Sequence, residues 1–298
     1  MSQLLIVGAT GVLGKVTAEL FLKNNYSVKA AVRNPTKAFD LQTAGATIVE
    51  ADLINPDSLA NICNNVEVVL ASAHSMMGKG KNTSQEVDGK GHKSLIDAAV
   101  KAGVQQFIYL SAYGASANHP IDFFRTKFEI EQYLIKSGLN YTILRPAAFM
   151  EWHMHNLLGK GLVEKGKTMV FGKGNNPTNF IAADDVAQFI FQIYKKEEFY
   201  NQVIDLSGPE NLTKNEVAAL YSKYLNNKTK ITHVPRAALK TFSYLLKPMH
   251  PGLARIMRVS LLADQADASM DNSLSVQRFG ITPTKAEDFI KAQVLNAK

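Results

Sequence analysis

A short apolar run that ends in three regularly spaced glycines constrains this chain more than any other feature. Leu4–Val7 carries no charge, which predicts a buried strand, and a helical pattern follows from Lys15 to Lys23. Gly8, Gly11 and Gly14 lie between them with the spacing G-x-x-G-x-x-G. Such a triplet is weak evidence alone, but at a strand-to-helix junction it is typical of a phosphate-binding turn.

Each glycine of this turn has a physical reason to lack a side chain. Gly8 permits the tight turn off the strand, Gly11 lets the backbone approach a pyrophosphate, and Gly14 lets the helix lie close on the sheet. The N–H groups at the helix N-terminus would then bind the phosphates. We therefore expect the turn to contact a dinucleotide through the three glycines and through Thr10, Val12 and Leu13. The alternative is a tight turn that binds no ligand.

Composition points to an ordinary globular protein. The chain has 298 residues, enough for one large domain or two joined ones, and 46% of them are hydrophobic. The single cysteine, Cys63, excludes an internal disulfide framework and suits a reducing compartment. No positively charged leader opens the chain, and no apolar run reaches the ~18 residues that span a bilayer. We expect a cytoplasmic protein with no membrane partner.

The net charge of +7 permits binding to anions of any kind. The lysines are spread along the chain, however, and none of their groups has the length of a basic arm. We expect no nucleic-acid partner. Self-association into a homo-oligomer remains open.

Strands alternate with helices through the first half of the chain. After the opening strand, the pattern predicts strands at Ser27–Val32, Thr47–Glu50, Val66–Ala71, Gln106–Leu110 and Tyr141–Arg145. This alternation predicts an α/β fold with a doubly wound parallel sheet. We assign residues 1–150 to this domain. Residues 151–298 would form a smaller, mostly helical substrate-side part, joined to the sheet by strands near 179–182 and 203–206.

Arg33 indicates which dinucleotide is bound. It ends the second strand, nineteen residues after Gly14, where an acidic residue would bind the ribose 2′-OH of NAD. Arginine suits the 2′-phosphate of NADP instead, and Lys37 adds a second positive charge. A surface arginine without a ligand is the alternative. We expect NADP, as NADPH.

The ends of the third and fourth strands supply further candidates, because ligands of such sheets lie outside the carboxyl ends of the strands. Asp52 and Leu53 follow the third strand, and Asp52 could reach the adenine. Ser72 and Ala73 end the fourth strand, and His74 next to them could donate a proton.

The segment from Asp122 to Gly138 predicts one helix, with Asp122 as N-cap and Gly138 just past its end. Phe123 and Lys127 share one stripe of this helix with Ile130 and Leu134. A lysine within an apolar stripe is costly without a partner, and a cofactor ribose and carboxamide would supply one. Alternatively, its ammonium reaches water.

Large and polarizable side chains follow the sixth strand. Pro146 and Phe149 are candidates for cofactor contacts, and Met150 and Trp152 for packing against a flat substrate. Ordinary core packing is the alternative. We expect no metal site, since His153 and His155 would diverge on a helix.

Signals in the last third of the chain are sparser. Thr213 with Glu216, and Thr284 with Glu287, form capping-box patterns that predict helix starts. The apolar, proline-interrupted segment 229–273 predicts amphipathic helices that form a lid or substrate wall. Peripheral packing or a subunit contact fits nearly as well.

Taken in order, these motifs resemble the short-chain dehydrogenase/reductase superfamily, and specifically its atypical NmrA-like branch. The resemblance covers about residues 1 to 215, and it includes Gly8–Gly14, Val32–Pro35, Tyr109–Ser111, Lys127, Leu144–Pro146 and Phe180–Ala187. It implies a Rossmann domain that binds NADP, with a smaller C-terminal part that closes over the substrate.

The resemblance also implies the catalytic candidates. Typical superfamily members use a Tyr-x-x-x-Lys pair, in which the tyrosine donates a proton. Here Lys127 occupies the lysine position, but Phe123 occupies the tyrosine position and has no proton to give. Ser111 matches the serine that follows the fifth strand, and Tyr113 and His74 are substitute proton donors. Phe123 would instead line the substrate pocket.

The NmrA-like branch offers two kinds of function. Some members are NADPH-dependent reductases of quinones, dyes or conjugated systems, and others bind the nucleotide without turnover and act as redox-responsive regulators. Our first hypothesis is an NADPH-dependent oxidoreductase that transfers hydride to a flat conjugated acceptor such as a quinone. The alternative is an NADP-binding regulator that acts through protein partners.

Overall fold

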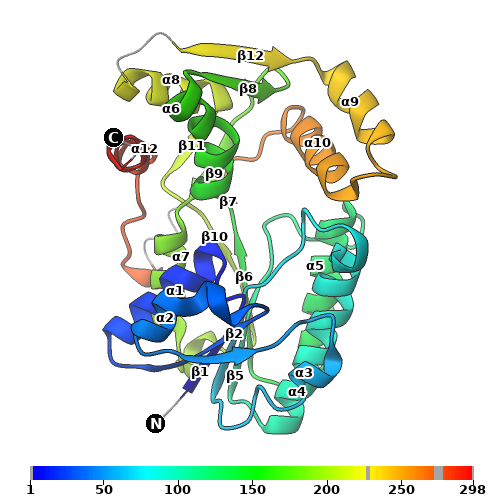
Figure 1. Cartoon of the computed structure of the whole chain (residues 1–298), viewed down its shortest axis with the longest axis vertical. Helices are drawn as coiled ribbons and strands as arrows, with labels where there is room; N and C mark the ends of the chain where they lie inside the picture. Colours follow the sequence, from blue (N-terminus) through cyan, green and yellow to red (C-terminus); the bar gives the residue numbers. More distant parts are fainter. Residues whose placement is uncertain (1–2, 226–228, 272–277, 297–298) are drawn as a thin grey trace. The chain divides into compact units, whose positions relative to one another are not determined.

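The computed structural model describes residues 3–225, 229–271 and 278–296. The chain divides into two compact units (Figure 1). Unit 1 comprises Met1–Arg145 and Val186–Asp205, and unit 2 comprises Pro146–Asp185 and Leu206–Lys298. Each is described separately below.

Unit 1 is built on a seven-stranded sheet of order β10-β6-β5-β4-β1-β2-β3. Its strands are β1 Gln3–Val7, β2 Ser27–Val32, β3 Thr47–Glu50, β4 Val68–Ala71, β5 Gln106–Leu110, β6 Tyr141–Pro146 and β10 Gln202–Leu206. Neighbouring strands from β3 at one edge to β6 pair in parallel. This confirms the predicted doubly wound α/β fold. The apolar runs were legible because both faces of a parallel sheet are buried.

Helices cover both faces of this sheet (Figure 1). One face packs against α1 Val12–Lys23, α2 Phe39–Thr43 and α7 Ala183–Ile193, where Phe21 meets the rings of Phe191 and Tyr194. The other face packs against α3 Pro56–Leu59, α4 His92–Ala102 and α5 Asp122–Ile135. Short helical turns complete the connections, at η1 Pro35–Ala38, η2 Gly80–Asn82, η3 Gln85–Gly91 and η5 Glu197–Phe199. The seven-residue η3 is a π-helix that runs directly into α4.

The strand order reverses direction at β1, which pairs with β2 on one side and β4 on the other. In sheets of this kind, the crevice outside the carboxyl ends of the strands at this reversal is where ligands bind. The glycine turn follows β1 directly, so the fold places it at this position.

The helix predicted from Asp122 is present, but its ends differ from the prediction. The N-cap is Ile121, and Asp122 is the first helical residue. There its carboxylate interacts favourably with the positive end of the helix dipole. The helix ends at Ile135, so Gly138 lies beyond the C-cap residue Lys136, in a left-handed conformation with φ of 82°.

Unit 2 combines helices with two small sheets, of order β11-β9-β7 and β12-β8. Its strands are β7 Ala148–Phe149, β8 Lys167–Phe171, β9 Thr178–Ile181, β11 Glu210–Leu212 and β12 Lys230–Val234. Its helices are η4 Glu151–Gly159, α6 Lys160–Lys165, α8 Lys214–Leu225, α9 Arg236–Leu245, α10 Pro251–Ala263 and α12 Ala286–Leu295. Segment 229–273 therefore opens with a strand that the sequence pattern did not predict. Its residues 272 and 273 lie outside the described part.

The two capping-box predictions had different outcomes. Thr213 and Glu216 form the predicted reciprocal bonds, with the Glu216 carboxylate accepting from the Thr213 backbone. The prediction for Thr284 was wrong. Its backbone N–H and hydroxyl both donate to the carboxylate of Asp185 in α7, and α12 begins at Ala286 instead. A tertiary partner displaced the local one.

Candidate functional site

The glycine turn after β1 has no space for side chains at two of its positions. Gly8 has a φ of 96°, and a Cβ there would lie 2.7 Å from the backbone nitrogen of Ala73. A Cβ on Gly14 would lie 2.2 Å from the carbonyl oxygen of Gly8. Gly8 thus lets β1 and β4 approach at their ends, and Gly14 lets α1 start directly against the turn.

The N-terminus of α1 is left open by the protein. Gly11 is its N-cap, and among the described residues no side chain caps the helix and no acidic residue lies in its first turn. Thr10, Gly11 and Val12 are exposed, whereas Leu13 is buried and anchors the helix. Uncapped N–H groups and the positive dipole end form an anion site, so this turn fits the phosphates of a nucleotide.

A cavity of about 700 Å³ adjoins this turn. Arg33 and Lys37 line it together with Thr10 and Asp52, as do Asn34, Ile54, Lys81 and Asn82. Three cations therefore converge on one hollow beside an open helix N-terminus, which suits a ligand with several phosphates. Lys81, which lies in η2, is a cation that the sequence did not assign to this site.

The end of β4 shapes the turn rather than presenting side chains to it. The Ser72 hydroxyl donates to the carbonyl of Val7 at 3.1 Å, and the N–H groups of Ser72 and Ala73 donate to the same oxygen. Leu53, after β3, is buried against the backbone at Gly91. Ser72, Ala73 and Leu53 hold the walls of the site in place.

Lys127 is almost fully buried, with 2% of its surface exposed. Its ammonium donates to the carbonyl of Leu110 at the end of β5 at 2.9 Å, and it lies 3.7 Å from the carboxylate of Asp88. The rings of Tyr109 and Phe123 lie against it, with centroids 4.9 and 5.6 Å away. The sequence reasoning expected a ligand to be its partner, but the protein itself supplies a carboxylate and a carbonyl.

Burial lowers the pKa of Lys127, and the neighbouring Asp88 carboxylate acts in the opposite direction. The backbone N–H of Ser75 donates to Asp88, which fixes that carboxylate. His92 lies one turn further along the same helical segment, and its burial lowers its pKa to about 4. It is therefore neutral at pH 7.

A second buried polar group lies beside this one. Glu131, on α5, accepts hydrogen bonds from the Ser111 hydroxyl and from the Arg145 guanidinium. Glu131 is fully buried, and Arg145 compensates its charge in a two-pronged pair. The hydroxyl of Ser111 is thus directed at Glu131.

The two candidate proton donors have different surroundings. Tyr113 follows β5 in a turn and is 41% exposed. His74 keeps an exposed surface, although its ring packs edge-on against Phe123 and the surrounding protein atoms desolvate it. That desolvation, followed by the charge of Lys127, lowers the pKa of His74. Phe123 itself is buried, with 6% of its surface exposed.

The remaining candidates lie in unit 2. Pro146 is buried and Phe149 is half-buried at the start of this unit. Met150 is fully buried in a cluster with Met154 and Tyr221, which is the core-packing alternative considered above. Trp152 is 37% exposed.

The sequence reasoning missed Asp88, His92, Tyr109 and Glu131, which surround Lys127 and Ser111. A signal for three of them was present, because Asp88 and His92 are four residues apart, as are Lys127 and Glu131. Polar pairs at this spacing share one helix face. On helices that cover a parallel sheet, such pairs suggest a buried polar cluster.

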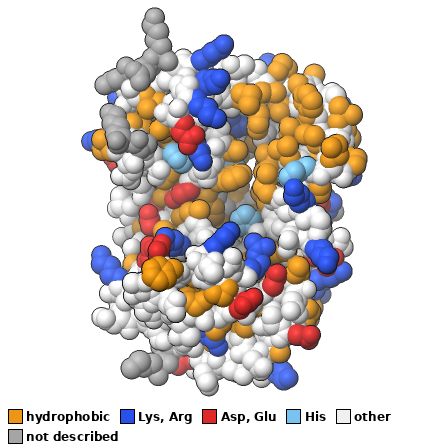
Figure 2. Space-filling view, in the orientation of Figure 1, with side chains coloured by type: hydrophobic (Ala, Val, Ile, Leu, Met, Phe, Trp, Pro, Cys, Tyr) orange, Lys and Arg blue, Asp and Glu red, His pale blue; other side chains and the backbone are white. Residues whose placement is uncertain are grey.

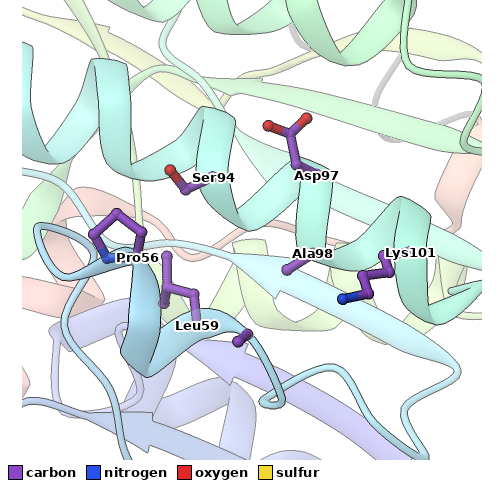
Figure 3. Close-up of a pocket in the computed structure, with 7 residues that line it drawn as sticks. Pro56, Leu59, Ser94, Asp97, Ala98 and Lys101 are labelled. Atoms are coloured by element: carbon purple, nitrogen blue, oxygen red, sulfur yellow. The ribbon is translucent and has the colours of Figure 1, made fainter.

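Unit 1 has a second, smaller cavity of about 250 Å³ between α3 and α4. Pro56 and Leu59 line it from α3, and Ser94, Asp97 and Lys101 line it from α4 (Figure 3). Its lining contains one cation, Lys101, together with the acidic Asp97, whereas three cations line the larger cavity. Among the described residues, no group of acidic, histidine and cysteine side chains could hold a metal ion.

Comparison with known families identifies the chain, since the model of the NmrA-like family matches residues 1–290. The chain belongs to the NmrA-like family. This agrees with the resemblance drawn from the glycine turn, Arg33 and Lys127.

Curated proteins similar to this chain include an assembly factor and a reductase. It is 29% identical over 240 residues to the photosystem II assembly factor Ycf39 of Cyanophora paradoxa, covering 80% of this chain and 73% of that one. It is 30% identical over 223 residues to an NAD(P)H azoreductase of Xenophilus azovorans, covering 74% and 73%.

Solved structures of similar fold include two reductases. An NADPH-dependent quinone oxidoreductase from Escherichia coli, complexed with NADPH, superimposes with a TM-score of 0.79 at 24% identity, over 97% of this chain and 99% of that one. The triphenylmethane reductase of Citrobacter sp. superimposes with a TM-score of 0.79 at 21% identity, over 99% and 100%. At these identities the likeness establishes the fold.

Proposed function

We propose that this chain is an NADPH-dependent oxidoreductase that reduces a flat, conjugated acceptor of the quinone class. The observation that carries the proposal is the cavity beside α1, where an open helix N-terminus meets Arg33, Lys37 and Lys81. The names of the azoreductase and quinone oxidoreductase relatives support the same reaction class. The single cysteine, Cys63, is buried and suits a cytoplasmic location.

The residues of unit 1 have separable roles in this proposal. The N-terminus of α1 binds the pyrophosphate, and Arg33 and Lys37 bind the 2′-phosphate of the adenosine ribose. Lys127 provides a fixed positive charge at the end of β5 for the nicotinamide ribose, and Asp88 and Leu110 hold its ammonium in place. Phe149 and Trp152 are our candidates for contacts with cofactor and substrate in unit 2.

The absence of a hydroxyl on Phe123 fits this substrate class. NADPH supplies hydride, and a quinone or azo acceptor delocalises the resulting negative charge, so that water can complete the protonation. A residue with a tyrosine's acidity is then unnecessary. The protein contributes orientation and an apolar surface, here the buried ring of Phe123 beside Lys127.

The test is steady-state NADPH consumption by the full chain with a panel of quinones, azo dyes and triarylmethane dyes. The proposal predicts turnover with at least one acceptor and a clear preference for NADPH over NADH. If no acceptor is reduced although NADPH binds, the oxidoreductase proposal fails.

That second outcome would favour the alternative, an NADP-binding redox sensor that acts through protein partners. The Ycf39 relatives support it, because their name describes assembly rather than turnover. It predicts a partner that binds the chain with NADPH but not with NADP⁺, or the reverse. A pull-down in both nucleotide states distinguishes the two proposals.

A further inference from the structure

The chain has a long segment without a single negative charge. Between Glu216 and Asp264 the sequence contains no aspartate or glutamate, whereas it contains eight lysines and arginines. Helices α9 and α10 lie within this segment. Its charge therefore favours anionic partners.

The same segment exposes large apolar side chains. Phe242 is 48% exposed, Tyr244 68% and Leu245 64%, and Met249 in the following turn is 81% exposed. We call these four residues the α9 patch. Figure 2 shows hydrophobic side chains gathered on the face where Figure 1 places α9 and α10. Apolar side chains that cluster in this way on a surface mark an interaction site.

The inner side of α9 is already occupied. Leu239 and Ser243 are buried, and α9 packs against α10, so the remaining surface of the helix faces outward. Tyr244 and Leu245 project from that outward side. Lys240, in α9, and Lys247, in the turn that follows the helix, are also exposed.

We propose that the α9 patch binds the surface of an anionic lipid bilayer, with its apolar side chains in the headgroup region and Lys240 and Lys247 on the lipid phosphates. Amphipathic helices that lie in a membrane interface combine apolar residues with lysines in this way. Tyrosine is enriched at this level of a bilayer because its ring is apolar and its hydroxyl polar.

A second copy of the chain fits the patch less well. A symmetric dimer through α9 would place two segments that lack negative charges against each other, and their lysines would repel. The anionic bilayer provides the opposite charge.

This inference departs from the expectation that the chain has no membrane partner. That expectation rested on the lack of a long apolar run, and the described residues indeed contain no helix able to cross a bilayer. A helix that lies in the interface needs only one apolar side, which Tyr244 and Leu245 provide within the ten residues of α9.

The experiment is co-sedimentation of the full chain with vesicles of phosphatidylcholine, with and without phosphatidylglycerol. We expect binding to the anionic vesicles at low salt and weaker binding at high salt, because salt screens exposed lysines. Lys240→Gln/Lys247→Gln should weaken binding about fivefold per lysine. Tyr244→Ser/Leu245→Ser should weaken it about tenfold per residue.

Matched variants elsewhere on the surface provide the controls. Lys23→Gln/Lys136→Gln changes the net charge equally, and Phe39→Ser removes a side chain that is 70% exposed in unit 1. Both should retain binding, and all variants should unfold at the wild-type temperature, since the substituted side chains are exposed.

Three results would overturn the proposal. The first is that the chain does not sediment with anionic vesicles at low salt. An acidic protein would then be the partner to test. Another is equal loss of binding in the patch and control variants. The third is a concentration-dependent dimer in sedimentation velocity that the Tyr244→Ser/Leu245→Ser variant abolishes, because the patch would then be a contact between copies.

Discussion

Arg33 is the residue that distinguishes the two nicotinamide nucleotides, because only NADPH carries a phosphate on its adenosine ribose. It lines the cavity beside Thr10. Hydrogen bonds to a charged group contribute about 1.5–3 kcal/mol, so Arg33→Ala should raise the Kd for NADPH roughly 10- to 150-fold. The Kd for NADH should change little. Calorimetric titration of both nucleotides measures this, with Lys23→Ala as the control, and equal losses for both would refute the assignment.

Asp88 is the residue on which the buried charge of Lys127 depends. Both side chains are almost without exposed surface. Asp88→Asn leaves an unpaired ammonium, and breaking a buried pair in this way costs about 3–5 kcal/mol. Urea unfolding should show this loss, whereas Glu86→Gln, which removes an exposed partner of Lys90 on the same helical segment, should change little.

The pH dependence of this variant has a definite sign. Burial already places the pKa of Lys127 in the folded protein below its value in the unfolded chain. The unfolded state therefore binds more protons between the two pKa values, and stability rises with pH in that window. The Asp88 carboxylate raises the pKa of Lys127, so its removal lowers that pKa further. The pH window should therefore extend to lower pH. A window that does not move would show that Asp88 does not stabilise the ammonium.

His92 makes the protein sensitive to acid. Its pKa is about 4 in the folded state, against about 6.5 when unfolded. The neutral His92 contributes roughly 3 kcal/mol to the free energy of unfolding above pH 6.5. This contribution is lost as the pH falls towards 4. His92→Phe, which keeps a ring against Tyr109, should reduce the difference in unfolding free energy between pH 7 and pH 4.5. His233→Phe, at an exposed site, should leave that difference unchanged.

At this scale, the sequence predicts residues whose role depends on local backbone. Gly8 and Gly14 are required by the geometry of the turn. Lys127 was recognisable because it lies on the buried, apolar side of α5. The partners of Asp88 and Glu131 could not be assigned in the same way, because they lie on other elements. Asp88 pairs with Lys127 of α5, and Glu131 binds Ser111 after β5 and Arg145 in β6. Only the fold brings those charges together.

The glycine turn and α1 form the element on which nucleotide binding depends, and two substitutions separate its roles. Gly14→Ala places a Cβ 2.2 Å from the Gly8 oxygen, so it should cost about 1–3 kcal/mol of stability or more. Gly11→Ala meets the same oxygen at 3.2 Å and should cost less than about 1 kcal/mol. A methyl group at this exposed N-cap would hinder the approach of a phosphate to the helix N-terminus, so NADPH binding should fall sharply. Urea unfolding and NADPH titration together check this, and unchanged binding by Gly11→Ala would contradict the phosphate site.

Elements were predictable from sequence where burial is two-sided. The predicted strands of unit 1 appear within about two residues of their expected ends, since a parallel sheet requires uninterrupted apolar runs. Strands of unit 2 such as β8 and β12 are of similar length, but exposed residues interrupt them, so they contain no uninterrupted buried run. Thr284 shows that tertiary contacts also limit such predictions. Its hydroxyl donates to Asp185, so it does not form the capping box with Glu287 that the local sequence predicts.

At the scale of the whole molecule, the sequence predicted the fold class and the family, but it left the substrate-side part unresolved. The reason is physical, since a nucleotide cavity needs fixed backbone geometry near Gly8, whereas unit 2 needs only apolar cores and surfaces of suitable shape. The uneven distribution of acidic residues along the chain is also a property of the whole molecule. Its acid-free stretch between Glu216 and Asp264 was hidden in an ordinary net charge of +7.

In the proposed reaction, NADPH held in the cavity beside α1 is oxidised by a conjugated acceptor. A single-turnover experiment tests it most directly, with the full chain preloaded with one equivalent of NADPH and mixed rapidly with a quinone while the absorbance of the reduced nicotinamide is followed. We expect a fast first-order loss of that absorbance, which Gly11→Ala and Arg33→Ala slow at the same NADPH concentration. NADPH that binds tightly but stays reduced in the presence of quinones, azo dyes and triarylmethane dyes would contradict it.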